Sequence, residues 1–133
     1  MRAADVALHE GDAAPRGEMW SRSDPVTLFG AAFTATGQDE VRAAFERLAS
    51  QFSDCRSFEI EVVAAGGGAD LGYLVAIERT TASVGGQDPT PYALRVTTIF
   101  RREQGEWKIV HRHGDPFDES ATSLATQLRG GPG

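Results

Sequence analysis

Residues 94–113 read LRVTTIFRREQGEWKIVHRH, and this run sets the architecture expected for the rest of the chain. Apolar and polar side chains alternate on both sides of Glu103-Gln104-Gly105-Glu106, a short polar run that contains a glycine. Alternation with a period of two is typical of a half-buried strand, and a glycine-containing run of this length is typical of a hairpin loop. The stretch therefore predicts two antiparallel strands joined by a tight turn.

The middle of the chain repeats this pattern. From Ser57 onward apolar residues alternate with polar ones until Gly66-Gly67-Gly68, where a turn is expected. A second strand-like run covers Leu71 to Ser83, and the turn-forming run 84–89 connects it to the strand Tyr92 to Arg102. Together with the closing hairpin, these strands predict an antiparallel meander.

Helices are predicted for the first half of the chain. Val41, Phe45, Leu48 and Phe52 recur at steps of three and four residues, which is the spacing of one stripe on an amphipathic helix. Thr36 has a residue type that caps helix N-termini, so we expect this helix to start there. The sequence also predicts a weak helix over Ala3 to His9, a short helix with Pro15 in its first turn that ends in Met19 and Trp20, and short extended pieces at Val26 to Phe29 and Ala32 to Thr34.

Helices followed by an antiparallel meander define the α+β class, and we expect a curved antiparallel sheet wrapped by N-terminal helices. A chain of 133 residues can bury one sizeable core. We therefore expect a single domain over residues 1–117. Residues 118–133 are small and polar and end in Gly-Gly-Pro-Gly, so they predict a flexible tail, with a short helix around residues 123–128.

Composition excludes several classes of partner. The formal net charge is -6 and no run of Lys and Arg is present, so we expect no nucleic-acid partner. Cys55 is the only cysteine, which excludes an intrachain disulfide and suits a reducing cytosol. No stretch approaches the ~20 apolar residues of a membrane span, so we expect no membrane partner and a cytoplasmic location.

Two parts of the sequence resemble a known family pattern. The first is Gly11-Asp12, a helix ending in Trp20, the strand DPVTLFG at residues 24–30, and Gly37 before the long helix; SnoaL-like proteins of the nuclear transport factor 2-like superfamily open in this way. The second is the closing hairpin at 94–113, which is similar to the end of the calmodulin-dependent kinase association domain. The resemblance implies a cone-shaped fold with an internal pocket.

The resemblance implies no single activity, because the superfamily includes ketosteroid isomerases, cyclases, dehydratases, hydrolases and oligomerisation hubs. Ketosteroid isomerase chemistry needs a carboxylate base and an oxyanion pair of a tyrosine and a carboxylic acid. By alignment, the base falls at Leu28, the acid at Thr98 and the tyrosine near Ala4. None of the three is retained, so we do not expect steroid isomerisation by that route.

A four-residue turn at 103–106 fixes a register for the closing hairpin. It places Arg102 opposite Trp107, Phe100 opposite Ile109, Thr98 opposite His111 and Val96 opposite His113. The apolar face then carries His111 and His113, and Asp115 continues the same series. That face is expected to line the interior.

These three residues are the candidate catalytic groups: His111, His113 and Asp115. Histidines with a neutral-range pKa suit acid–base or hydrogen-bonding roles. Two alternatives stay open. The HxHxD run could hold a metal, although a metal site needs a further ligand, and the histidines could serve structure alone. We expect neither metal nor cofactor.

The candidate ligand contacts are mostly aromatic residues that could stack on a planar compound, with core packing as the alternative. Glu78 and Arg79 lie on opposite faces of one strand, so one of them must point inward; an inward Arg79 could meet a carboxylate, and an exposed ion pair is the alternative. The predicted ligand-binding set is Trp20, Leu28, Tyr73, Arg79, Thr98, Phe100 and Trp107.

Three functions are compatible with these features. The first is a pocket for a small apolar or aromatic molecule, either as a binding domain or as a cofactor-independent isomerase, cyclase or lyase. The second is a homo-oligomerisation module without catalysis, in which Arg95, Thr97, Ile99 and Arg101 form the working surface of a homodimer through the sheet. The third is a metal-dependent enzyme that relies on the HxHxD run.

Overall fold

The computed structural model describes residues 2–117 and Leu128. Within them, the helices are α1 (Arg2–His9), α2 (Ala14–Glu18) and α3 (Gln38–Gln51), and the strands are β1 (Thr27–Phe29), β2 (Thr34–Thr36), β3 (Phe52–Gly67), β4 (Leu71–Val84), β5 (Thr90–Glu103) and β6 (Glu106–Pro116). The predicted α+β class is confirmed. The predicted tail and its short helix fall almost entirely outside the described residues.

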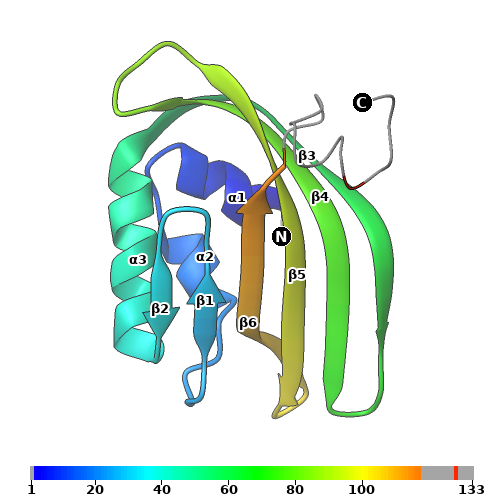
Figure 1. The fold of residues 1–133 in the computed structure, drawn as a ribbon. Helices are drawn as coiled ribbons and strands as arrows, with labels where there is room; N and C mark the ends of the chain where they lie inside the picture. Colours follow the sequence, from blue (N-terminus) through cyan, green and yellow to red (C-terminus); the bar gives the residue numbers. More distant parts are fainter. Residues whose placement is uncertain (1, 118–127, 129–133) are drawn as a thin grey trace.

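All strands join one six-stranded sheet in the order β2-β1-β6-β5-β4-β3 (Figure 1). The meander from β3 to β6 is antiparallel, as predicted, but β1 runs parallel to β6, so the sheet is mixed. This pairing closes the fold, because it brings the short β1–β2 ribbon beside the last strand. Two parallel strands need a long connection between them, and here the connection from β1 to β6 comprises most of the domain.

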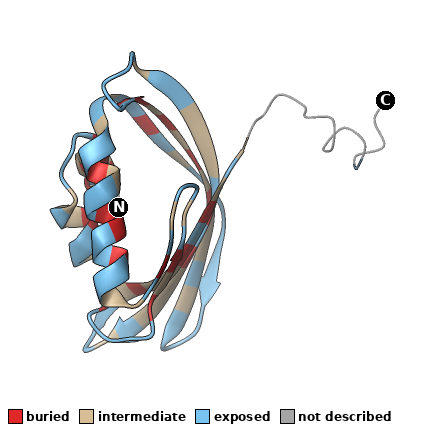
Figure 2. Cartoon of the chain, turned by 60° about the vertical axis from the view of Figure 1, so that its left-hand side comes forward, coloured by how far each residue is buried: buried red, intermediate tan, exposed pale blue. Residues whose placement is uncertain are grey.

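The sheet is curved, and the helices lie on its concave side (Figure 2). Between α2, α3 and the β1–β6 end of the sheet lies a cluster of buried apolar residues, namely Trp20, Val26, Leu28, Ala35, Val41, Ala44, Phe45 and Ile109. The edge strand β3 is different, because only Phe58 is buried along its 16 residues. This cluster therefore fills the β1–β6 side of the concave face, α1 packs against β3, and the turn between β3 and β4 is exposed.

Helix α3 begins one residue later than the sequence predicts. Gly37, with a φ of 87°, occupies the N-cap position that we expected for Thr36. From outside the helix, Asp24 Oδ1 accepts from the Gln38 N–H at 3.1 Å. In the first turn, Glu40 Oε1 reaches back and accepts from the N–H of Thr36, which precedes the helix, at 3.2 Å. The buried stripe of the helix ends at Ala49, because Phe52, the last residue of the predicted stripe, already belongs to β3.

The register of the closing hairpin changes at a β-bulge. Near the turn the predicted pairs are confirmed, since Arg102 pairs with Trp107 and Phe100 with Ile109. One step further Ile99 pairs with His111, so Val110 is an extra residue on β6. Beyond it, the predicted partners of Thr98 and Val96 are wrong: they are Arg112 and Gly114.

The bulge exchanges the two faces of the second half of β6. Arg112 points to the concave side and is buried, whereas His111 is half-buried and His113 exposed on the convex side. A single extra residue has this effect because successive side chains on a strand alternate between faces. Among the described residues, no helix is long and apolar enough to cross a membrane.

Candidate functional site

A buried ion pair on the concave side joins β6 and β4, the two strands that flank β5. Arg112 on β6 donates two parallel hydrogen bonds to the carboxylate of Glu78 on β4, at 2.8 and 2.9 Å, and both side chains are buried. Burial alone would raise the pKa of Glu78, but the hydrogen bonds and charge of Arg112 hold it below its ordinary value. Glu78 is therefore a fixed anion.

A second buried ion pair links the helices that cover this end of the sheet. Asp5 on α1 pairs with Arg16 on α2, and both are fully enclosed. Burial lowers the pKa of Arg16 to about 9, and the nearby positive charge of Arg112 contributes to the shift. The interior thus holds two guanidinium groups and two carboxylates, so its charge is balanced.

His9 and Tyr92 complete this interior network. The Nδ1 of His9 lies 2.7 Å from the Asp5 carbonyl oxygen and donates to it, which leaves Nε2 to accept from the Tyr92 hydroxyl. Burial lowers the pKa of His9 to about 4 and raises the pKa of Tyr92 to about 12. Neither group changes its protonation near neutral pH, so both hold α1 against β5.

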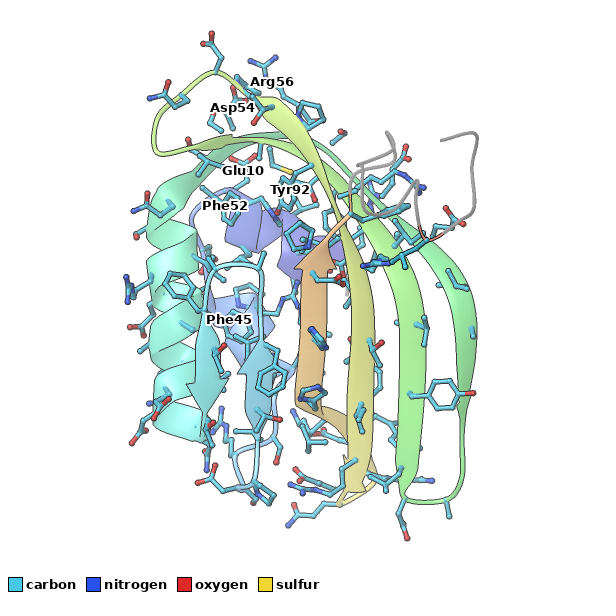
Figure 3. The ribbon with its side chains drawn as sticks, in the orientation of Figure 1. Glu10, Phe45, Phe52, Asp54, Arg56 and Tyr92 are labelled. Atoms are coloured by element: carbon cyan, nitrogen blue, oxygen red, sulfur yellow. The ribbon has the colours of Figure 1, made fainter. Side chains whose placement is uncertain are left out.

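Aromatic packing encloses this network. The His9 ring lies 4.3 Å from that of Phe52, which stacks on Tyr92 at 6.1 Å. Phe52 and Tyr92 lie at the same end of the molecule, whereas Phe45 lies between α3 and α2 (Figure 3). The network is thus a filled, cross-linked end of the concave side.

Next to the exposed β3–β4 turn lies a cavity of about 390 Å³. Its lining combines glycines with three aromatic residues, namely Gly66, Gly67, Gly68, Gly72, Tyr73, Phe100 and Trp107, and we refer to it as the aromatic slot. Trp107 is 45% exposed. At Gly67 a Cβ would lie 2.5 Å from the Leu71 carbonyl oxygen, so only glycine fits and the backbone itself forms part of the wall.

Thr98 lies next to this slot. It precedes Phe100 by two residues on the same face of β5, between Leu74 on β4 and Arg112 on β6. The residue is 1% exposed, and its hydroxyl has no hydrogen-bond partner within the part of the chain that the structure describes. Buried hydroxyls are normally paired, so Thr98 is an unsatisfied polar group beside an aromatic cavity.

The structure separates the predicted ligand-binding residues. Thr98 and Phe100 face the concave side as expected, and Leu28 faces the same side. Trp107 borders the aromatic slot from the concave face, whereas Tyr73, which pairs with Ile99, borders it from the convex face. Trp20 lies apart from them, in the apolar core against Phe45.

Of the two alternatives for Arg79, the structure shows the exposed ion pair, and Glu78 is the inward residue of the two. Arg79 lies on the convex face, where its guanidinium donates to Glu61 at 2.8 Å. The reason is the position of Arg112: once the bulge turns that guanidinium inward, Glu78 has a buried partner and a second inward cation would have none.

The candidate catalytic residues also lie on the convex face, so their predicted place in the interior is wrong. His111 shares a 2.7 Å hydrogen bond with the Thr27 hydroxyl, and the Phe29 ring contacts His111 and His113 edge-on at 5.5 and 5.6 Å. Asp115 pairs with Arg95 at 2.6 Å. Residues 2–117 contain no cluster of His, Cys, Asp and Glu that could hold a metal.

These side chains are part of a continuous surface on the convex face. Strand pairing puts Tyr73, Ile99, His111 and Thr27 in one row and Val75, Thr97, His113 and Phe29 in the next, and we call these eight residues the convex patch. The patch contains no carboxylate, Lys or Arg. The charged residues around it are paired within the chain, as Glu61–Arg79, Arg95–Asp115 and Arg101–Glu103.

Sequence reasoning missed the interior network of Asp5, His9, Arg16 and Arg112. One signal was available: Asp5, Leu8 and His9 are spaced as one face of a helix, so a buried helix would bury two polar groups together. Arg112 gave no such signal, because its inward direction depends on the bulge.

Comparisons with known proteins agree with this architecture. A crystal structure of a proposed calcium/calmodulin-dependent protein kinase type II association domain from Thiobacillus denitrificans is similar, with a TM-score of 0.72, 21% identity, and coverage of 88% of this chain and 91% of that one. A proposed dehydratase of the NTF2-like family from Streptomyces avermitilis gives a TM-score of 0.69, 16% identity and coverage of 88% and 90%.

A proposed ketosteroid isomerase from Parabacteroides distasonis gives a TM-score of 0.65 at 15% identity, covering 88% of this chain and 84% of that one. At these identities the likeness concerns the fold alone. Among curated proteins, none matches the chain. The model of the SnoaL-like domain matches residues 2–117, nearly all that the structure describes. The chain therefore belongs to the SnoaL-like domain family. This confirms the resemblance that the opening strand and the closing hairpin indicated.

Proposed function

We propose that the chain binds a small, uncharged, ring-containing molecule on the concave side of its sheet, between Thr98 and the two concave rings of the aromatic slot, Phe100 and Trp107. The observation that supports this most directly is a cavity of about 390 Å³ with exposed aromatic walls next to a buried hydroxyl that has no partner in the described residues. Ligand sites are commonly apolar cavities of this size with a few polar groups.

Charge favours a neutral ligand. The buried ions nearest to the slot already balance one another, and Arg112 is committed to Glu78 by two hydrogen bonds. A charged ligand would have to displace one of these ions, which would leave its partner unpaired in a buried site. A neutral ring with one polar substituent has no such penalty and can pair with the Thr98 hydroxyl.

The slot favours binding over acid–base catalysis. Its lining contains no carboxylate, histidine, lysine or cysteine, and Tyr73 is its only ionisable member. The interior His9 and Tyr92 have pKa values displaced from neutrality, to about 4 and about 12. Proton transfer at neutral pH needs a group whose pKa lies near the working pH.

Fluorescence can test this proposal, since Trp20 and Trp107 are the two tryptophans. In a Trp20→Phe background, emission comes from Trp107 alone, and we expect a neutral bicyclic ring compound to quench it saturably. Its carboxylated analogue should bind at least about tenfold more weakly. Thr98→Val should weaken binding, whereas Val84→Ala, remote from the slot, should not. Equal binding of the charged and neutral compounds would refute the proposed ligand class.

A second function is favoured by the convex patch, namely homodimerisation through the sheet. The patch carries no net charge, and its charged neighbours are satisfied within their own chain, so two copies can meet about a twofold axis without opposing like charges. One similar structure is named as an association domain. The cytosolic location expected from the single cysteine stays a prediction.

Sedimentation velocity at neutral pH tests the dimer. We expect twice the monomer mass for the unmodified chain and a monomer for Ile99→Asp, which buries a charge at the centre of the patch. Glu59→Ala, on the same face but outside the patch, should remain dimeric. A monomeric unmodified chain at about 100 µM, well above the Kd of a typical specific interface, would contradict the dimer.

A further inference from the structure

A second cavity lies on the helical side of the molecule, between α2 and α3 (Figure 1 shows the two helices). It has a volume of about 550 Å³ and shares no lining residue with the aromatic slot. We call it the α2–α3 groove. It is lined by residues 13, 14, 17 and 18 from the α2 region, by residues 20–22 and 26, and by residues 38, 41, 42, 45 and 46 from α3.

The floor of the groove is part of the apolar core. Trp20, Val26, Val41 and Phe45 all contribute to it, and each is at most 4% exposed. The charged members of the lining are exposed and comprise two cations and two anions: Arg22, Arg42, Glu18 and Glu46. An apolar floor beneath a balanced rim is suited to an uncharged molecule.

Trp20 is the unusual member of this floor. Its indole Nε1 is buried, and residues 2–117 provide no acceptor for it. The backbone around Trp20 is fixed, because Ser21 donates to the Ile109 carbonyl and Ile109 donates to the Met19 carbonyl, both at 2.9 Å. The indole therefore cannot shift outward with its chain segment to reach water, and a buried N–H without an acceptor is rare in folded proteins.

The α2 wall leaves room for an acceptor to approach. Ala13, Ala14 and Gly17 form this wall, and a Cβ placed on Gly17 would meet no atom within 4 Å. Glycine weakens a helix, and no positive φ or close contact requires it at this position. The absence of a side chain at residue 17 keeps the groove open.

We propose that the α2–α3 groove is a second binding site, for a small apolar molecule whose single carbonyl or ether oxygen accepts the hydrogen bond of the Trp20 indole. This proposal is independent of the ligand on the concave face, because the two sites have no residue in common. The groove differs from the slot in the ligands it selects, since the Trp20 indole N–H can donate a hydrogen bond but cannot accept one.

The test uses Trp107→Phe, which leaves the Trp20 indole as the only indole N–H in the chain, so the signal reports on the groove and not on the slot. Two matched probes differ in one oxygen: indan-1-one carries a carbonyl, and indane lacks it. In a ¹⁵N-correlated NMR titration, we expect indan-1-one to move the indole signal downfield saturably. Indane should bind at least about tenfold more weakly, because the indole N–H then stays unpaired.

Two variants at one position then locate the site. Gly17→Leu fills the open space and should abolish the indole shift, while Gly17→Ala adds one methyl group and should retain it. Melting curves of both variants check folding. If Gly17→Leu does not fold, the comparison of the two probes decides alone. An indole signal that millimolar indan-1-one leaves unmoved, equal affinity for indane, or full binding by a folded Gly17→Leu variant would each overturn the proposal.

Discussion

The concave and convex faces of the same sheet accommodate polar side chains in opposite ways. On the concave side, charged groups are buried and each finds its partner inside the protein, as Glu78 does with Arg112. On the convex side, ion pairs such as Arg95–Asp115 stand in solvent around a patch of half-exposed rings. The difference indicates that the buried polar groups hold the fold together, whereas the convex patch is available for a partner.

The largest effect expected from this difference is the loss of a buried cation. Arg112→Ala leaves the Glu78 carboxylate buried without its two donors, and we expect the free energy of unfolding to fall by about 3–5 kcal/mol. Arg95→Ala removes an ion pair with a single hydrogen bond of 2.6 Å from the convex face, where solvent screens it, and should change stability by less than about 1 kcal/mol. Urea unfolding of both variants measures the contrast, and similar losses for the two would contradict it.

The next effect concerns acid and the interior histidine. Burial lowers the pKa of His9 to about 4, so between pH 6.5 and 4 the unfolded chain binds a proton that the folded chain refuses. Stability from this group is therefore complete above pH 6.5 and is lost as the pH falls through that window, by about 3 kcal/mol. Glu78, whose pKa is lowered by Arg112, adds a further loss below pH 4.5.

Unfolding free energies measured at pH 7 and pH 4.5 test this window. The expected decrease should be clearly smaller in His9→Gln, which cannot titrate, although that variant starts from a lower stability because the Tyr92 hydroxyl loses its acceptor. An equal decrease in the variant would show that other groups cause the acid sensitivity.

A smaller effect of opposite sign is expected at the proposed ligand contact. Thr98→Val replaces an unpaired buried hydroxyl with a methyl group of similar shape, so we expect a gain of about 1 kcal/mol in stability. Thr97→Val, at the neighbouring exposed position, should change stability by less than about 0.5 kcal/mol. A loss at Thr98 would mean that its hydroxyl already has a partner, and would weaken the case for a ligand there.

The sequence predicts the element order and most of the fold, because those depend on local patterns. The alternation in 94–113 and the stripe of Val41 and Phe45 both correspond to elements of the structure. The prediction failed where one extra residue changed the register between β5 and β6. The bulge at Val110 depends on packing between strands, and no glycine or proline marks it in the sequence. The candidate histidines therefore faced the wrong side, and Arg112 went unnoticed.

The smallest effect comes from comparing two histidines on the two faces. His111 also has a lowered pKa, through partial burial and the adjacent His113, but it is hydrogen-bonded to Thr27 at a half-exposed site. We expect His111→Gln to change stability at pH 7 by less than about 0.5 kcal/mol, because water can replace the lost contact.

The effect of His111→Gln should instead fall on assembly. In the unmodified chain, acid charges the histidine, and a charge disfavours a buried dimer interface. Sedimentation at pH 8 and pH 5.5 should show dissociation in acid for the unmodified chain and less of it for His111→Gln. A His111→Gln variant as unstable as His9→Gln would remove the distinction between the faces, since a convex side chain would then hold the fold as firmly as a buried one.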